Sequence, residues 1–271
     1  MAVTAVDFDD LPAPVRTAIE AETGPILKTE TVSAGLNSAL HVPLHSARGT
    51  VFLKRLRTDH RCVWTQQREA DINPYVTPLA PSLLFHTVTD GWDILGFEAG
   101  DGHHADYSPG SADLPKVAAA MRQLGEIPCL DIELRRAEQR LAGYVDTPTD
   151  AEAFKGDTLL HTDWNNHNVL VADGRAQLVD WGWAPRGAAW LDPAYWIIWL
   201  IAAGHNPVEA ETWAARIPSW SSAPDADVDV FAEANTRVWT EIAGRSPDTW
   251  TARLLSAAER WHDHRIVRHH Q

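Results

Sequence analysis

Short apolar runs separated by turn residues fill the first hundred positions, a pattern that is typical of β-strands. The expected strands are residues 28–33, 38–43, 51–56, 83–89 and 92–98. The last two are expected to pair across Asp90-Gly91, a dipeptide that favours the tight turn of a hairpin. Helical spacing is expected only at residues 15–22 and 65–75. The pattern therefore predicts a β-rich first third with two helices.

Beyond residue 110 the apolar positions recur every three or four residues, which indicates amphipathic helices. The expected helices are residues 114–124, 132–144, 192–203, 208–215, 229–242 and 247–264. The segment 99–110, rich in Gly, His and Asp, is expected to be a connector. Asp192 is expected to cap the helix that Pro193 begins, and its apolar stretch is too short to cross a bilayer. The fold class predicted from these patterns is α+β.

One segment of the second part, residues 161–183, breaks the helical pattern. It reads HTDWNNHNVLVADGRAQLVDWGW and places Asp163 five residues before Asn168. A strand hairpin is expected next, turning at Asp173-Gly174, and Asp180 follows it. Each aspartate alone is readily explained as a loop cap or a strand end. Together they suit phosphoryl transfer, which requires an oriented hydroxyl and oxygen ligands for Mg²⁺.

Two charged residues of the first third fit the same chemistry. Lys54 lies in the expected strand 51–56, directly after a glycine-containing turn, and a lysine there can contact phosphates as a point charge. Glu69 follows on the next helix, fifteen residues later, where it can pair with Lys54. Alone, Lys54 would be a solvated strand residue, Glu69 a surface acid, and Gly35 and Asn37 turn residues. Only their order and spacing together suggest a phosphate-binding site.

These motifs resemble those of the aminoglycoside phosphotransferase family, which has a fold like that of the eukaryotic protein kinases. Asp163 to Asn168 resembles the catalytic loop of that family, and Asp180-Trp181-Gly182 resembles its metal-binding motif. Leu191-Asp192-Pro193 resembles the Gly-Asp-Pro that follows. The segment SAGLNSALHV resembles the nucleotide-covering loop, and ILGFEAGDG resembles the hinge. The likeness extends from about residue 30 to residue 205.

The resemblance implies a bilobal fold, with a small β-rich N-lobe over residues 1–98 and a larger, mainly helical C-lobe over residues 99–271. It implies ATP or GTP as co-substrate and Mg²⁺ as cofactor. Asp163 would be catalytic, and Asn168 and Asp180 would bind the metal. The implied nucleotide-binding residues are Gly35, Asn37 and Ser38 in the covering loop, Lys54 with its partner Glu69, and Phe97, Glu98 and Ala99 in the hinge.

Three positions depart from the family pattern. Thr162 stands where the family usually has glycine, Gly125 where a histidine is common, and Trp196 where a second aspartate often occurs. None of them removes a residue needed for metal binding or proton transfer, so they bear on the substrate subclass. His161 matches the family's loop histidine, which braces the loop.

Composition narrows the possible partners. The formal net charge of −14 argues against nucleic acid and anionic membranes as ligands.

Cys62 and Cys129 fit neither a disulfide framework nor a metal site, and the acidic N-terminus lacks a signal pattern. A cytoplasmic location is therefore expected. His103-His104 and the histidine-rich tail lack the spacing of zinc ligands.

The expected function is a kinase that transfers the γ-phosphoryl group of ATP or GTP to a hydroxyl group. An aminoglycoside-like antibiotic, a sugar, an amino alcohol or another metabolite would all fit as acceptor, and antibiotic resistance is one possible role. A nucleotide-binding pseudokinase that acts through partner proteins is the alternative. A protein kinase is disfavoured, because no Ala-Pro-Glu segment or long activation loop lies between Asp180 and Asp192.

The acceptor is expected to bind among the connector, the catalytic loop and the helices after Asp192. Acids in that region would recognise the amines of a cationic substrate. The candidates are Glu209, Glu211, Asp225, Asp227 and Asp229.

Overall fold

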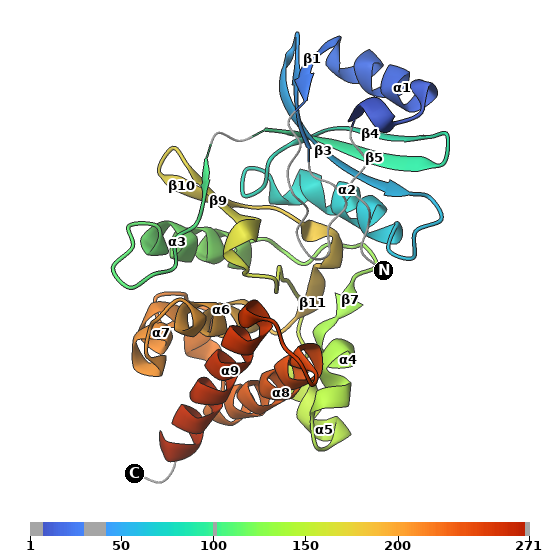
Figure 1. Ribbon diagram of the computed structural model, residues 1–271. Helices are drawn as coiled ribbons and strands as arrows, with labels where there is room; N and C mark the ends of the chain where they lie inside the picture. The colour runs from blue at the N-terminus through green and yellow to red at the C-terminus, as the bar shows by residue number, and fades with distance from the viewer. Residues whose placement is uncertain (1–7, 30–41, 100–101, 269–271) are drawn as a thin grey trace. The chain divides into compact units, whose positions relative to one another are not determined.

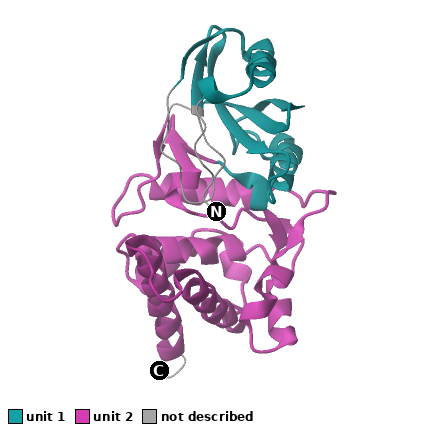
Figure 2. Ribbon diagram, turned by 45° about the vertical axis from the view of Figure 1, so that its right-hand side comes forward, with its two compact units in different colours: residues 1–101, 179–183 teal, residues 102–178, 184–271 magenta. Residues whose placement is uncertain are grey.

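The computed structural model describes residues 8–29, 42–99 and 102–268. The chain forms two compact units, shown in different colours in Figure 2. Unit 1 comprises Met1–Asp101 with Val179–Trp183, and unit 2 comprises Gly102–Leu178 with Ala184–Gln271. The lobe boundary expected after residue 98 stays a prediction.

Unit 1 contains a five-stranded antiparallel sheet in the order β1-β2-β3-β5-β4. Its strands are β1 Ile26–Thr29, β2 Val42–Ser46, β3 Gly49–Arg57, β4 Leu83–Thr89 and β5 Trp92–Glu98. The predicted hairpin of residues 83–89 and 92–98 is confirmed. Asp90 and Gly91 have φ of 45° and 75°, the positive values that a type I′ turn requires. Most of the strand expected at 38–43 lies outside the described residues.

Each face of this sheet is next to one helix (Figure 1). Helix α1, Ala13–Thr23, covers one face, where Val15 and Ile19 pack against Leu53 and Ile94 in a single apolar cluster. Because side chains alternate along a strand, Lys54 points to the other face, where α2, Trp64–Val76, lies. Both helices were predicted. The alternation thus turns Lys54 away from the apolar cluster and toward α2.

Unit 2 contains two small sheets, in the orders β10-β9-β6 and β7-β11-β8. Their strands are β6 His103–His104, β7 Arg135–Arg136, β8 Thr158–Leu159, β9 Val169–Ala172, β10 Arg175–Leu178 and β11 Pro185–Gly187. The hairpin predicted around Asp173-Gly174 is confirmed as β9 and β10. The connector is less irregular than predicted, because His103 and His104 pair with β9.

Helices are the main secondary structure of unit 2. They are α3 Leu114–Gly125, α4 Ala137–Leu141, α5 Pro148–Ala151, α6 Leu191–Ala202, α7 Pro207–Ala214, α8 Asp225–Ala243 and α9 Thr249–Arg268. Short 3-10 turns lie in unit 1 at Phe8–Asp10 and Trp181–Trp183, and in unit 2 at Ala142–Tyr144, Glu152–Phe154, Asn166–Asn168 and Trp220–Ser222. In the described ranges, no helix is long and apolar enough to span a membrane.

Five of the six helices predicted for this part are confirmed, with ends that differ by a few residues. The helix expected at residues 132–144 is wrong in its first half. There β7 is extended and pairs in parallel with β11, and α4 begins only at Ala137. Pairing with a strand fifty residues away has overridden the local helical pattern.

Candidate active site

Lys54 forms a buried ionic cluster in unit 1 with two carboxylates. Its Nζ donates to the Glu69 carboxylate and, over 2.5 Å, to Oδ1 of Asp180. Lys54 comes from β3, Glu69 from α2, and Asp180 from the segment that follows β10. The Asp180 side chain is 26% exposed, whereas those of Lys54 and Glu69 are buried. The expected pairing of Lys54 with Glu69 is present, and Asp180 joins it.

The two carboxylates keep Lys54 in its charged form. Burial acts to lower the pKa of Lys54, but the negative charges of Asp180 and Glu69 outweigh it and hold the pKa above its ordinary value. Lys54 is therefore charged throughout the physiological range. Burial raises the pKa of Glu69, and the charge of Lys54 acts in the opposite direction. Asp180 is the most exposed member of the cluster.

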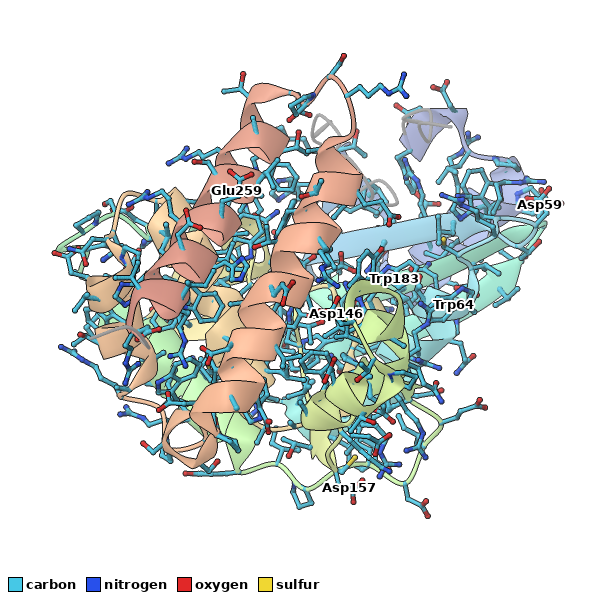
Figure 3. All side chains as sticks on the ribbon, turned by 90° about the horizontal axis from the view of Figure 1, so that it is seen from below. Asp59, Trp64, Asp146, Asp157, Trp183 and Glu259 are labelled. Carbon is cyan, nitrogen blue, oxygen red and sulfur yellow. The ribbon has the colours of Figure 1, made fainter. Side chains whose placement is uncertain are left out.

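The segment after Asp180 is fixed to α2 by close contacts. The backbone N–H of Trp181 donates to Oε1 of Glu69 over 3.2 Å. The rings of Trp64 and Trp183 meet edge to face with centroids 4.9 Å apart (Figure 3). A Cβ atom at Gly182 would come within 2.8 Å of Cβ of Thr65, so only glycine fits there. Asp180 itself has φ of 68°, a conformation that non-glycine residues adopt mainly where neighbours impose it.

Asp163 and Asn168 lie in one loop of unit 2, before β9. The Asp163 side chain is exposed, and its Oδ1 accepts a long hydrogen bond of 3.4 Å from the Asn165 N–H. Nδ2 of Asn168 donates to the Asp163 carbonyl oxygen over 3.4 Å. Asn165 shapes the turn between them, because its side chain accepts from the His167 N–H. The loop thus presents the Asp163 carboxylate to solvent.

Asp192 holds this loop from the inside. It is buried and accepts hydrogen bonds from the His161 N–H (3.1 Å), the Thr162 N–H (2.8 Å) and the Trp164 indole (2.9 Å). Burial raises its pKa, and these donors act in the opposite direction. The prediction that Asp192 caps α6 is wrong, because Trp190 is the N-cap residue and Asp192 lies in the first turn. Its carboxylate is engaged by the loop on both sides of Asp163.

Thr162 has φ of 63°, in the left-handed region that favours glycine. This accounts for the glycine that the resembling family usually has at the position. A β-branched residue is strained there, and two contacts hold it in place. Its N–H donates to Asp192, and its Oγ1 accepts from Nη1 of Arg140 over 3.2 Å.

The other predicted nucleotide-binding residues fall into two groups. Phe97 and Glu98 end β5, and the N–H groups of Glu98 and Ala99 donate to the carbonyl oxygens of Ser82 (2.9 Å) and Thr50 (3.4 Å). Those two N–H groups are therefore engaged within unit 1. The predicted residues Gly35, Asn37 and Ser38 lie outside the described residues.

The fold class is α+β, with a β-sheet region and a mainly helical C-terminal part, and it matches a protein-kinase-like fold. No protein-family model matches the sequence, and no curated protein matches it either.

Solved structures show the likeness over almost the whole chain. Aminoglycoside phosphotransferase APH(4)-Ia matches with a TM-score of 0.63 at 13% identity, over 91% of this chain and 98% of that one. Choline kinase LicA from Streptococcus pneumoniae matches with a TM-score of 0.61 at 12% identity, over 93% and 100%. Spectinomycin phosphotransferase APH(9)-Ia matches with a TM-score of 0.59 at 10% identity, over 92% and 93%.

Proposed function

We propose that this chain is a kinase that transfers the γ-phosphoryl group of ATP or GTP to a hydroxyl group of a small molecule. The carrying observation is the buried cluster of Lys54, Glu69 and Asp180. Burying a lysine with two carboxylates from distant segments costs desolvation energy, so we attribute the cluster to a function and not to stability alone. Contact with nucleotide phosphates and their metal is the purpose that its charges fit.

Asn168 and Asp180 are the proposed ligands of Mg²⁺. Both offer hard oxygen donors of the type that Mg²⁺ prefers. Asp180 is the most exposed member of its cluster, and the Asn168 amide donates through Nδ2, which leaves its oxygen for a ligand. When bound, the metal neutralises charge on the phosphates. Lys54 would contact the same phosphates, with Glu69 fixing its direction.

Asp163 is the proposed group that orients the acceptor hydroxyl and receives its proton. Its carboxylate is exposed on a loop whose backbone is fixed by Asp192. Holding two reactants in line can supply roughly 7–11 kcal/mol of the barrier. A fixed loop with an exposed carboxylate suits this positioning task. The backbone of Phe97, Glu98 and Ala99 is proposed to hold the adenine or guanine base, and the segment with Gly35, Asn37 and Ser38 to cover the phosphates.

Complexes of the structural neighbours support the proposal that the substrates are a nucleotide and a small acceptor. A thermostable mutant of APH(4)-Ia has been solved with ADP and hygromycin B, and APH(9)-Ia with ADP and spectinomycin. At these low identities they support the reaction class and leave the acceptor open. The free cysteines Cys62 and Cys129 support the proposal of a cytoplasmic location.

The proposal is tested with a coupled assay of ATP and GTP consumption over a panel of sugars, aminoglycosides and amino alcohols, with and without Mg²⁺. We expect consumption that requires Mg²⁺ and rises when the right acceptor is added. The Asp163→Asn variant is the matched control and should lose this stimulation. Tight binding of Mg-nucleotide without stimulation by any acceptor would favour the pseudokinase alternative instead.

A further inference from the structure

The two halves of the loop that carries Asp163 are held in different ways. Asp192 holds the first half from the inside, through three hydrogen bonds from residues 161–164. The second half, residues 165–168, contains the proposed metal ligand Asn168 and receives none of these three bonds. Other contacts in unit 2 must therefore fix this half.

The side chain of Asn168 is only weakly held. Its Nδ2 donates to the Asp163 carbonyl oxygen over 3.4 Å, which is long for a hydrogen bond. Its backbone N–H is better engaged, because it donates to the Asn165 carbonyl oxygen over 2.8 Å. That bond closes the 3-10 turn Asn166–Asn168, whose middle residue is His167. The direction of the Asn168 amide therefore depends on how this short turn is kept in place.

A side chain of the connector contacts this turn on its exposed side. His104 of β6 lies edge to face with His167, with ring centroids 4.8 Å apart and an interplanar angle of 65°. The His104 ring also forms a hydrogen bond with the backbone of His167. His167 directly precedes Asn168, so both contacts act on the turn next to the proposed metal ligand.

Strand β6 is a firm base for these contacts, because its backbone is fixed without the His104 side chain. The strand pairs with β9 over two residues. The Ala105 N–H then donates to the Val169 carbonyl oxygen over 2.8 Å. A Cβ atom at Gly102 would come within 2.9 Å of the Val171 carbonyl oxygen, so the two segments are in close contact there as well. Removing the His104 ring should therefore leave the strand in place.

The His104 ring is uncharged at pH 7 and above. Partial loss of hydration lowers the pKa of His104 below its ordinary value of 6.5. The charges that His167 and His103 can carry act in the same direction, and the hydrogen bond to His167 acts against them. An uncharged ring can pack against a second imidazole without repulsion. Both side chains are exposed, so their contact adds little to the burial that stabilises the fold.

We propose that His104 is a positioning residue, which holds Asn168 in the geometry for metal binding through its ring contact with His167. This inference rests on the proposed kinase function, in which Asn168 is a ligand of Mg²⁺. Residues that orient a metal ligand without touching the metal commonly change metal affinity about 10–100-fold when they are lost. His104 would act in this way.

The test measures how much Mg²⁺ strengthens nucleotide binding. A non-hydrolysable analogue of ATP or GTP is titrated calorimetrically, once with Mg²⁺ and once with EDTA, at pH 8. In His104→Ala we expect the gain in affinity on adding Mg²⁺ to fall about 10-fold. The affinity for metal-free nucleotide and the urea unfolding midpoint should stay as in the wild type. An undiminished gain in this variant would overturn the inference.

Two further variants separate the ring contact from a general effect on the connector. His104→Phe keeps a ring that can lie edge to face with His167, and its gain should be within about 3-fold of the wild type. His103→Ala is the matched control, because side chains alternate along a strand and His103 binds Asp113 instead. It should leave the gain unchanged. Equal losses in His104→Phe and His104→Ala, or in His103→Ala, would refute the role of the ring contact.

Hydrogen exchange followed by NMR gives a readout that needs neither metal nor turnover. The Asn168 N–H is protected by its bond to Asn165, and it should exchange several-fold faster in His104→Ala than in the wild type. The Ala105 N–H, bonded to Val169, should exchange at the same rate in both proteins. Equal exchange of the Asn168 N–H in the two proteins would contradict the proposed role of His104.

Failure of the proposed function has a different result. In that case the wild type would consume no nucleotide with any acceptor, and Mg²⁺ would not strengthen nucleotide binding. The exchange rates of the Asn168 N–H would still decide whether His104 holds the turn.

Discussion

The two sets of proposed catalytic residues are built in opposite ways. In unit 1, Lys54, Glu69 and Asp180 bind one another directly, with most of their polar atoms withdrawn from water. In unit 2, the Asp163 side chain is exposed, and the shape of its loop depends on buried Asp192. In the first set, the atoms that hold the structure together are also the atoms proposed to act on the nucleotide. In the second set, Asp192 holds the loop and Asp163 is proposed to act on the acceptor.

This difference has a consequence for how each set responds to substitution. A buried ion pair that loses one partner leaves an uncompensated charge in a poorly solvated place, which is strongly destabilising. An exposed carboxylate can be neutralised without such a penalty, since water solvates either form. Changes in unit 1 should therefore impair folding and function together. Changes at Asp163 should impair function alone, and changes at Asp192 should act through the loop.

The largest effect is expected for Asp163→Asn. Turnover should fall about 10²–10⁴-fold, the usual scale for a positioned acid–base group, while the dissociation constant of the nucleotide and the unfolding midpoint stay as in the wild type. Steady-state kinetics, nucleotide titration and urea unfolding measure the three quantities. Asp173→Asn, in the exposed turn of the neighbouring hairpin, makes the same chemical change and should leave all of them intact. Undiminished turnover would remove Asp163 from its role.

Lys54→Met should lower stability and nucleotide affinity at once. The variant leaves the Glu69 and Asp180 carboxylates together without their cation, and breaking a buried pair in this way costs about 3–5 kcal/mol. Urea unfolding followed by tryptophan fluorescence measures the loss. Lys155→Met is the control, because Lys155 pairs with Glu152 on the surface, where both side chains are more than half exposed. Such surface pairs contribute about 0–1 kcal/mol. Equal losses of stability in the two variants would show that the buried cluster contributes no more than a surface ion pair.

Asp192→Asn should have an intermediate effect. The amide can accept only through one oxygen, so at least one of the three N–H donors that now bind the carboxylate would be left buried and unpaired, at a cost of about 1–3 kcal/mol. Turnover should fall with little change in nucleotide affinity, because the loop that carries Asp163 loses its brace. Asp131→Asn, at an exposed position, is the matched control. Normal turnover in a destabilised Asp192→Asn variant would show that the loop holds its shape without the charge.

Much of the fold could be predicted from the sequence where signals are local. The hairpin around Asp90-Gly91 was predicted to the residue, because alternation and turn chemistry agree there. The pairing of Lys54 with Glu69 was also predictable, since both lie on neighbouring elements with strong patterns. Those features need only short-range information. The helix expected at residues 132–144 failed because Arg135 and Arg136 are committed to a strand fifty residues away.

The parts of the site that were missed depend on contacts over longer distances. Asp192 looked like a helix cap because Asp-Pro is a common helix start, and nothing local shows that its carboxylate accepts from residues thirty positions earlier. The sequence shows which acids could bind an amine. It does not show that Glu211, Asp225 and Asp229 form ion pairs with Arg265, because these pairs depend on how α7, α8 and α9 pack. Spacing identifies chemical groups, and packing determines which of them remain available.

The smallest effect concerns Asp113, which fixes the connector after β6. Its buried carboxylate accepts from His103, Lys116 and the Asp106 N–H. Burial acts to raise the pKa of Asp113, but these partners outweigh it and lower the pKa to about 2, from an ordinary value of 3.8. The folded state therefore favours the charged form, and the resulting stabilisation is complete above pH 3.8 and is lost as the pH falls toward 2.

At pH 7 this ionisation contributes about 2 kcal/mol to the free energy of unfolding. Asp113→Asn should lose that amount at pH 7, and the difference from the wild type should shrink as the pH is lowered from 5 to about 3. Urea unfolding at each pH measures it. A difference between the two proteins that stays constant with pH would mean that the carboxylate acts through its shape and not through its charge. In that case the connector would be held by packing, and the charge of Asp113 would add nothing to its stability.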